Sequence, residues 1–275
     1  MPHPPWPDSA TCSAPMLVRL LNGFRLDIGQ REVALPVHAQ RVMAFLALSR
    51  PSGMSQHRTA LAEQLWCDGP RQRAQASLRT AIWRIRQADD RLVHADRGHV
   101  YLSALVEIDV ERSLDQAGRL LNGDGDLEPD DTATTGLVAD LLPGWEEEWL
   151  IVERERIHQV RIHALVALSH RLRRLGRFIP ALNAAYTAIT AEPLQESARA
   201  ALVEIHLAEG NVVEARRQVD QYAQLLWDEM QLTPSAALIA RVPRPMGGPN
   251  RAQQRDGVPS DQEGLRPPAK FRVPG

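Results

Sequence analysis

Residues 70–88 read PRQRAQASLRTAIWRIRQA, and this stretch decides the fold that we expect for the chain. Small and apolar residues recur in it at spacings of three and four, which predicts an amphipathic helix from Pro70 to about Ala88. The expected buried seam consists of Ala74, Leu78, Ala81, Ile82 and Ile85. At about 100° per residue, the opposite face contains no acidic residue and consists of Gln72, Arg73, Ala76, Thr80, Trp83, Arg84 and Gln87, with Ser77 and Arg79 on its flanks.

This acid-free face of the 70–88 helix predicts contact with duplex DNA. Arginine can donate two hydrogen bonds to one guanine, and small residues let a helix enter the major groove. Solvated helix faces usually mix acidic and basic side chains, so the absence of acids favours this interpretation. An ordinary solvated face is the alternative interpretation of the same residues.

The segment before this helix predicts three short strands followed by two helices. The strands are expected at 17–21, 24–27 and 32–35, with turns at Asn22-Gly23 and Gly29-Gln30. Helical periodicity then covers about 38–49. We expect Ser55 to cap the second helix and Asp68 to cap the helix at 70–88.

The segment after the 70–88 helix predicts a β-hairpin, with strands at 92–95 and 99–102 and a turn at 96–98. Arg97 at its tip is positioned to enter a minor groove, and Arg58 near the second helix start to meet a phosphate. Trp66 either closes the core or offers its indole N–H to a phosphate, and both roles are compatible.

The distribution of charge along the chain agrees with a domain that binds nucleic acid, joined to a second domain that does not. Thirteen arginines face seven carboxylates over 16–103, whereas four arginines face fifteen carboxylates over 105–159. This basic front and acidic middle lie within a net charge of only −2. There is no apolar run of the roughly 18 residues that a membrane span needs. Because the start of the chain has neither a basic segment nor an apolar segment of a signal peptide, we expect a cytoplasmic protein.

The second half of the chain predicts an all-α repeat domain. Residues 122–136 are expected to form a loop, and from Trp145 onward the pattern is helical, with Trp145 and Trp149 as packing anchors. Gly176 and Gly210 mark turns 34 residues apart, the period of tetratricopeptide repeats. The expected domains are a disordered tail at 1–15, a winged helix at 16–104, a helical repeat domain at 105–242 and a disordered tail at 243–275.

Enzyme chemistry is not expected. Cys12 and Cys67 are the only cysteines, His158 and His163 have no metal-binding spacing, and the acidic run 146–148 suits a helix start. No nucleophile motif is present. We therefore expect no catalytic, cofactor-binding or metal-binding residue.

Several motifs now resemble a known family. The element order, together with Ser55, Leu61, Leu65-Trp66 and the run 77–86, resembles the OmpR/PhoB-type winged helix. Downstream, the runs WEEEW at 145–149, AEPLQE at 191–196 and AEGN at 208–211 are similar to the bacterial transcriptional activator domain. The pair of domains, over about 17–240, resembles the SARP-type bacterial activators. The fold implied is mainly α: an N-terminal winged helix-turn-helix (α+β) followed by an all-α tetratricopeptide-like domain.

The resemblance implies a sequence-specific transcriptional regulator, most simply an activator. Its partners would be double-stranded promoter DNA with repeated elements, RNA polymerase and a second copy bound as a dimer or side by side. The expected DNA-binding residues are Arg58, Trp66, Arg73, Ala76, Ser77, Arg79, Thr80, Trp83, Arg84 and Arg97. Trp83 departs from the polar or basic residue of many relatives, and packing on a sugar or a partner is expected of it.

Two alternatives stay open on the sequence. In the first, the chain is a tetratricopeptide-type interaction scaffold whose winged helix makes protein contacts only. Salt dependence separates the two, because a DNA binder that neutralises about six phosphates loses affinity steeply as salt rises. In the second, the protein represses transcription, which the residues do not distinguish from activation.

Overall fold

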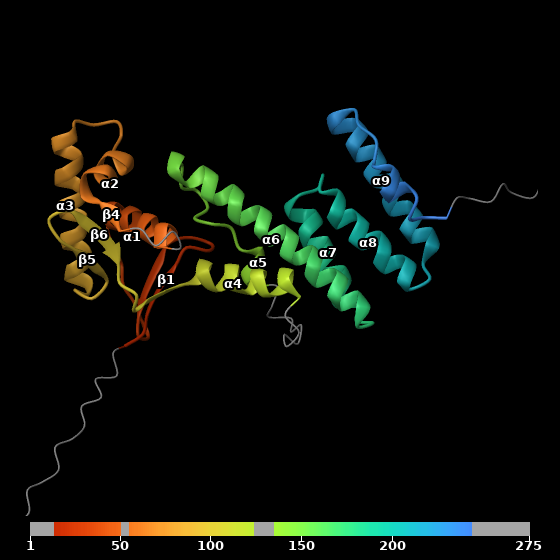
Figure 1. Ribbon diagram of the computed structural model, residues 1–275, viewed down its shortest axis with the longest axis horizontal. Coiled ribbons are helices and arrows are strands. Elements are labelled where there is room, and N and C mark those ends of the chain that lie inside the picture. Colours follow the sequence, from red (N-terminus) through yellow and green to blue (C-terminus); the bar gives the residue numbers. More distant parts are fainter. Residues whose placement is uncertain (1–13, 51–54, 124–134, 244–275) are drawn as a thin grey trace, which may run out of the picture. The chain divides into compact units, whose positions relative to one another are not determined.

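The computed structural model describes residues 14–50, 55–123 and 135–243. These residues are mainly helical, and their strands all lie between Met16 and Ile108 (Figure 1). The expected fold class, a winged helix followed by an all-α domain, is confirmed. The predicted tails at 1–15 and 243–275 fall, apart from Ala14, Pro15 and Pro243, outside the described residues.

The first element of the fold is a four-stranded sheet. Met16 and Val18 alternate with less buried residues in its first strand, so one side of that strand is buried. The order of the sheet is β3-β2-β1-β7, formed by β1 (Met16–Arg19), β2 (Arg25–Ile28), β3 (Arg31–Glu32) and β7 (Val106–Ile108). Strands β1 and β2 pair antiparallel, whereas β1 and β7 pair parallel, with Met16 opposite Val106. Strand β7 therefore completes the first sheet, although it follows the domain boundary that we expected at 104/105.

Three helices follow, and most of the first, beyond its exposed first turn, is buried on every side. Helix α1 (Val37–Ser49) has seven consecutive buried residues from Val42 to Leu48, as expected for the centre of a core. Helix α2 (Arg58–Leu65) packs against helix α3 (Arg71–Ala88), and α3 also packs on α1. The predicted helices at 38–49 and 70–88 are thus confirmed to within one residue at each end.

Two predicted helix caps are wrong. Residues Gln56 and His57 form strand β4, which pairs with β6 (His99–Leu102), so α2 starts at Arg58 and Ser55 does not cap it. Strand pairing therefore outweighs the capping preference of Ser55. Helix α3 starts after Pro70 without a side-chain cap, and Asp68 lies two residues before Pro70.

The hairpin after α3 is confirmed, and it belongs to a three-stranded sheet. Strand β5 (Val93–Ala95) pairs antiparallel with β6, and β4 pairs with the other edge of β6. Val93, Val100 and Leu102 are buried, whereas His94, His99 and Tyr101 are exposed. This alternation packs one side of the hairpin on the winged-helix core.

The helical part follows the predicted rhythm. Its elements are α4 (Asp109–Asn122), α5 (Thr135–Val138), α6 (Glu148–Arg174), α7 (Phe178–Ala191), α8 (Glu196–Ala208), α9 (Val212–Met230) and α10 (Ala236–Ile239). Gly176 and Gly210 end α6 and α8 with φ angles of 71° and 79°. Ala181 and Ala215, the matched residues of the repeat, are fully buried. Most of the predicted loop at 122–136 falls on residues that the structure does not describe.

The core of the winged helix draws residues from the helical part. Leu141, Leu142, Leu150 and Ile157 are buried in the same cluster as the strands and helices of residues 16–110. Backbone bonds accompany this packing: Leu142 N donates to Leu20 O at 2.8 Å, and Asn22 N donates to Asp140 O at 2.7 Å. The two predicted domains therefore contact each other directly in the free chain, a point on which the sequence is silent.

Candidate nucleic-acid interface

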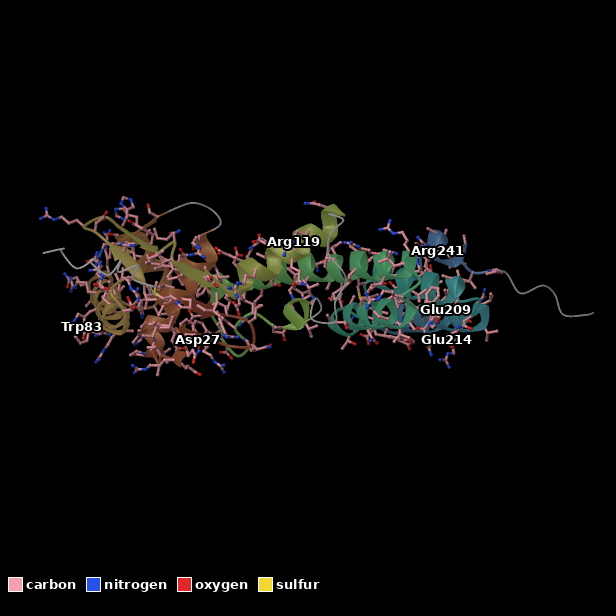
Figure 2. The ribbon with its side chains drawn as sticks, turned by 90° about the horizontal axis from the view of Figure 1, so that it is seen from below. Asp27, Trp83, Arg119, Glu209, Glu214 and Arg241 are labelled. Atoms are coloured by element: carbon pink, nitrogen blue, oxygen red, sulfur yellow. The ribbon has the colours of Figure 1, made fainter. Side chains whose placement is uncertain are left out.

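Helix α3 presents the predicted face to the surface. Its apolar seam is buried, as expected. On the opposite side Arg73, Thr80, Trp83 and Arg84 are exposed, whereas Ala76 and Ser77 are partly buried. Figure 2 shows Trp83 on the outside of the winged helix. The exposed fraction of this residue is 52%. The side of α3 that carries the predicted DNA contacts is thus not part of the protein's own core.

Contacts at its C-terminal end hold α3 in place. Arg86 Nη2 donates to Ala95 O at 3.1 Å, which joins the last turn of the helix to β5. Just beyond the helix, Arg91 donates from its side chain and its backbone N–H to Asp89 Oδ1, each at 2.9 Å. The Arg91 side-chain hydrogen bond is the main reason why the pKa of Asp89 lies below its ordinary value. A helix fixed in this way presents its exposed face without further ordering.

Two residues in the middle of the face have internal contacts. The Arg84 guanidinium lies 4.8 Å from the ring centroid of Trp83, a cation–π arrangement that keeps both side chains along the helix surface. Thr80 Oγ1 donates to Ala76 O at 3.1 Å. In this rotamer the hydroxyl proton is engaged inside the helix, so Thr80 offers a lone pair, an acceptor, to the outside.

Three of the predicted arginines meet around one small hollow. Arg58 of α2, Arg79 of α3 and Arg97 of the β5–β6 turn line a concavity of about 190 Å³. Arg58 is held there by Arg58 N to Gly98 O at 2.9 Å and by its Nη1 to Asp96 O at 3.1 Å. Three cations around one concave surface form a natural site for an anion such as a phosphate oxygen.

The turn that carries Arg97 is shaped by Asp96. The Asp96 carboxylate accepts the backbone N–H groups of Gly98 at 2.7 Å and His99 at 2.6 Å. These hydrogen bonds, with that of His99 the stronger, lower the pKa of Asp96 below its ordinary value. The ionised carboxylate therefore keeps the turn closed and holds Arg97 beside Arg58 and Arg79.

The predicted DNA-binding arginines share one electrostatic property. In the part of the chain that the structure describes, none of Arg58, Arg73, Arg79, Arg84 and Arg97 forms an ion pair with a carboxylate. Elsewhere arginines commonly do, for example Arg19 with Asp27 and Arg50 with Glu111. Five arginines without a carboxylate partner thus lie on the face and around the hollow described above.

The surroundings of Trp66 favour packing, one of its two predicted roles. Its ring packs against the winged-helix core, with the Arg41 guanidinium 5.6 Å and the His38 ring 6.0 Å from its centroid. Its indole Nε1 is buried and finds no hydrogen-bond partner among the described residues. Packing is therefore the role that this geometry supports. A phosphate contact requires the ring to turn and stays a prediction.

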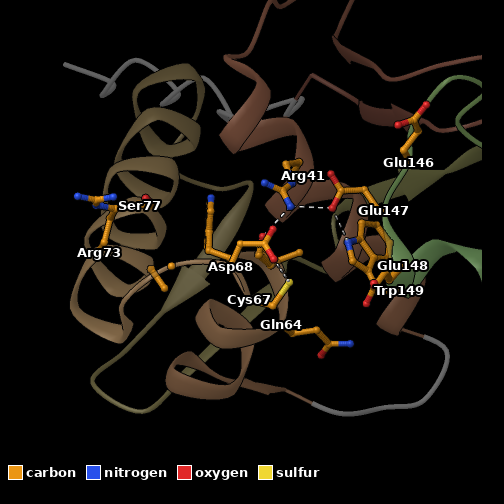
Figure 3. Close-up of a pocket in the computed structure, with 14 residues that line it drawn as sticks. Arg41, Gln64, Cys67, Asp68, Arg73, Ser77, Glu146, Glu147, Glu148 and Trp149 are labelled. Atoms are coloured by element: carbon orange, nitrogen blue, oxygen red, sulfur yellow. Dashed lines mark hydrogen bonds and ion pairs between the residues drawn. The ribbon is translucent and has the colours of Figure 1, made fainter.

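A larger cavity lies beside α3 and was not expected from the sequence. It has a volume of about 870 Å³ and lies between the α2–α3 connection and the start of α6 (Figure 3). Arg41 crosses it, donating from Nη2 to Leu65 O at 2.6 Å and to Glu147 Oε2 at 2.7 Å. Arg73 and Ser77 line the same cavity. Sequence reasoning missed this cavity because Arg41 and Glu147 are distant in the chain, and the run WEEEW at 145–149 gives no sign that its central glutamate meets Arg41.

The tryptophans at the start of the helical part act as packing anchors, as predicted. Trp149 meets Phe45 edge to face at 5.1 Å, and Trp145 stacks with Phe24 at 6.4 Å between ring centroids. Trp149 Nε1 also donates to Glu147 Oε2 at 3.2 Å. These rings fasten the segment before α6 to the winged helix.

Two further classes of site find no support in the described ranges. No helix there is both long and apolar enough to cross a bilayer. Within the same ranges, no three histidine, cysteine, aspartate or glutamate side chains are grouped as a metal ion would need.

Comparison with known proteins relates the helical part to a described family and the fold to a solved structure. Residues 131–242 match the family described as the bacterial transcriptional activator domain. Among solved structures, EmbR of Mycobacterium tuberculosis, in complex with a low affinity phosphopeptide, superposes with a TM-score of 0.68 at 16% identity. The match covers 83% of this chain and 64% of that EmbR chain, so this chain spans less than two thirds of it. At this identity the likeness shows a shared fold. No curated protein matches the chain.

Proposed function

We propose that this chain is a SARP-type bacterial transcriptional activator that binds DNA in a sequence-specific way, because residues 131–242 match the bacterial transcriptional activator domain and follow a winged-helix fold. In this proposal α3 enters the major groove of promoter DNA. The helical part contacts RNA polymerase or a second copy bound to a neighbouring promoter repeat. The protein acts in the cytoplasm, on the nucleoid, and catalyses no reaction.

One observation carries the proposal: five arginines around α3 have no carboxylate partner among the described residues. An arginine on an ordinary solvated face gains from a nearby acid, as Arg25 does from Glu32 and Arg217 from Glu214. Here no carboxylate forms an ion pair with these arginines, and that of Asp96 is engaged by backbone N–H groups, while the hollow of Arg58, Arg79 and Arg97 gathers three like charges. Such an arrangement repels itself unless an anion binds, and the phosphates of duplex DNA supply anions in a regular array.

We assign the contacts in two groups. Arg58, Arg79 and Arg97 neutralise phosphates and set the register of the protein on the duplex. Arg73 and Arg84 donate to base edges, and Thr80 accepts from them as a short polar contact. Ala76 and Ser77 leave room for the helix to approach the groove. Trp83 packs on a sugar or on Arg84.

The proposal is tested by selecting binding sequences from a pool of random duplex DNA with the full chain. We expect enrichment of a defined motif and weaker binding to its scrambled version. Replacing Arg84→Ala should remove about 1–3 kcal/mol of discrimination, the usual worth of a bidentate base contact. The matched control is Arg217→Gln on α9, an exposed arginine of the helical part. It should leave the preference unchanged.

The rival proposal, an interaction scaffold, predicts a different result from the same experiment. A scaffold enriches no motif and shows no DNA affinity that falls as salt rises. Equal binding to selected and scrambled duplexes by the wild-type chain would reject sequence-specific regulation. Transcription from a promoter that carries the selected motif, with and without the protein, then separates activation from repression.

A further inference from the structure

A second site is indicated by Arg161, a buried arginine in the middle of α6. Only 6% of its surface is exposed, and no other arginine among the described residues is as deeply buried. Its Nε donates to Leu137 O at 2.7 Å. Its two terminal nitrogens make no hydrogen bond or ion pair with any described residue. A buried charge without a partner is costly, so such a residue is expected to have a use.

The free end of Arg161 faces a hollow surface. Two cavities of about 620 and 670 Å³ lie along α6, and both are lined by Asp140, His158 and Arg161. Because these residues are shared, the cavities adjoin each other at Arg161. Each has the volume of a typical small-molecule site.

The lining of these cavities is largely apolar around the cation. The first cavity adds Leu141, Pro143, Ile151 and Ile157, and the second adds Leu137, Val138, Leu165, Tyr186 and Ala191. Asn183, Thr187 and Thr190 supply polar groups in the second cavity. A ligand that fits therefore combines an apolar body with one group that pairs with a guanidinium.

The other charged groups at the cavities limit the charge of the ligand. Asp140 and Glu155 carry carboxylates there, while Arg154 is engaged with the carbonyl oxygens of Leu141 and Leu142. His158 lies 3.8 Å from Glu192. Arg161 is thus the one free cation among the described lining residues, and the two carboxylates oppose a second negative charge.

We propose that these adjoining cavities bind a small organic monoanion, whose carboxylate pairs with Arg161 and whose apolar body packs against Leu137, Leu141 and Leu165. Burial lowers the pKa of Arg161, while the carboxylate of Asp140 acts in the opposite direction without forming an ion pair with it. This inference does not depend on DNA binding.

The site adjoins the segment that ties the helical part to the winged helix. Five residues of the 137–143 segment line the cavities, and in the same segment Asp140 O and Leu142 N are hydrogen-bonded to Asn22 N and Leu20 O. A bound ligand therefore touches the residues that hold the first sheet. The amides of Leu20 to Asn22 report its binding from outside the cavity.

The test is titration of the isotope-labelled full chain with octanoate, followed by amide NMR. Octanamide, which has the same body without the charge, and octyl phosphate, which carries more charge, serve as comparisons. We expect octanoate to shift amides at 137–143, in α6 and at Leu20 to Asn22. Octanamide should shift none, octyl phosphate should bind more weakly, and Arg161→Met should weaken octanoate binding at least tenfold.

Stability gives an independent readout, with Arg154→Met as the matched control on the same helix. Arg154 holds two carbonyl oxygens, so its loss should lower the urea midpoint. Arg161→Met removes a buried charge together with only one carbonyl contact, that to Leu137 O, so its midpoint should fall less than that of Arg154→Met, or rise.

Several results would overturn the proposal. The first is a urea midpoint that falls as far in Arg161→Met as in Arg154→Met. The second is octanamide binding as tight as octanoate binding. The third is octanoate binding that is unchanged in Arg161→Met. Tighter binding of octyl phosphate would overturn the monoanion class. An absence of shifts up to about 10 mM octanoate, which would fill even a millimolar site, would overturn it altogether.

Discussion

Arg41 Nη2 lies 2.7 Å from Glu147 Oε2 and joins helix α1 of the winged helix to the residue that precedes α6. Both side chains are about four-fifths shielded from solvent, with exposed fractions of 20% and 21%. The same carboxylate oxygen accepts from Trp149 Nε1, and the same guanidinium covers Trp66. The pair is therefore part of a network between the two halves of the chain, unlike an isolated surface ion pair.

We predict that Arg41→Met destabilises the protein by about 1–3 kcal/mol, because Glu147 and Leu65 O are left without their donor in a shielded site. Urea unfolding measures this loss. The matched control is Arg25→Met, whose partner Glu32 is well exposed. That pair should be worth less than about 1 kcal/mol. Equal losses in the two variants would show that the Arg41 network adds nothing to an ordinary surface pair.

The hollow of Arg58, Arg79 and Arg97 makes a prediction about salt. If each arginine neutralises a phosphate, Arg79→Gln lowers the slope of log affinity against log salt by about 1 and weakens binding to all sequences alike. Fluorescence anisotropy with duplex DNA over a series of salt concentrations measures the slope. Arg217→Gln removes the same charge from α9 and should leave the slope unchanged. An unaltered slope for Arg79→Gln would place Arg79 away from the phosphates.

Asp96 makes a prediction about pH. Its pKa is lowered in the folded protein from an ordinary value of 3.8, chiefly by the His99 and Gly98 N–H groups. The stability that it contributes is therefore complete above the ordinary pKa and is lost as the pH falls through the lowered one. We expect the stability difference between wild type and Asp96→Ala to be constant above about pH 5 and to vanish in stronger acid.

Urea unfolding at a series of pH values measures this difference. Asp96→Asn is the control, because it keeps one acceptor oxygen but does not titrate. Its deficit relative to wild type should be smaller than that of Asp96→Ala, and it should fade over the same pH range. A deficit of Asp96→Ala that persists unchanged in acid would show that the carboxylate charge does not support the turn.

Two glycines of the helical part should respond in opposite directions to the same substitution. Gly210 has a φ of 79°, whereas Gly118 lies inside α4, and an added Cβ meets nothing within 4 Å at either position. Gly210→Ala should cost about 1–2 kcal/mol for the left-handed backbone. Gly118→Ala should gain about 0.5–1 kcal/mol of helix propensity. Thermal or urea unfolding compares them, and a common sign would contradict the assignment of Gly210 as a helix-ending turn.

Local pattern was sufficient to predict the parts of the fold whose causes are local. The seam of α3 buries Leu78, Ile82 and Ile85 because their spacing leaves them on one side of the helix. The hairpin follows from two apolar runs around Asp96-Arg97-Gly98, and the turn at Gly210 from its repeat spacing with Gly176. The exposed arginine face of α3 was predicted by the same projection.

Other features depend on contacts between residues far apart in the chain. Strand β4 exists because Gln56 and His57 pair with β6, so the capping preference of Ser55 is overruled. The hollow of Arg58, Arg79 and Arg97 assembles three segments, and only their individual charges were visible beforehand. Arg161 falls at a position of α6 that no polar pattern distinguishes. Its burial depends on how residues 137–143 lie against the helix.

The parallel pairing of β7 with β1 has a consequence for synthesis. Val106 must lie beside Met16, and Ile157 must reach the same cluster, before the first core is closed. A ribosome therefore has to release more than half of the 275 residues before the winged helix can be completed. Until then the nascent β1 has an open edge, which makes the emerging chain a client for whatever shields unpaired strands in the cell.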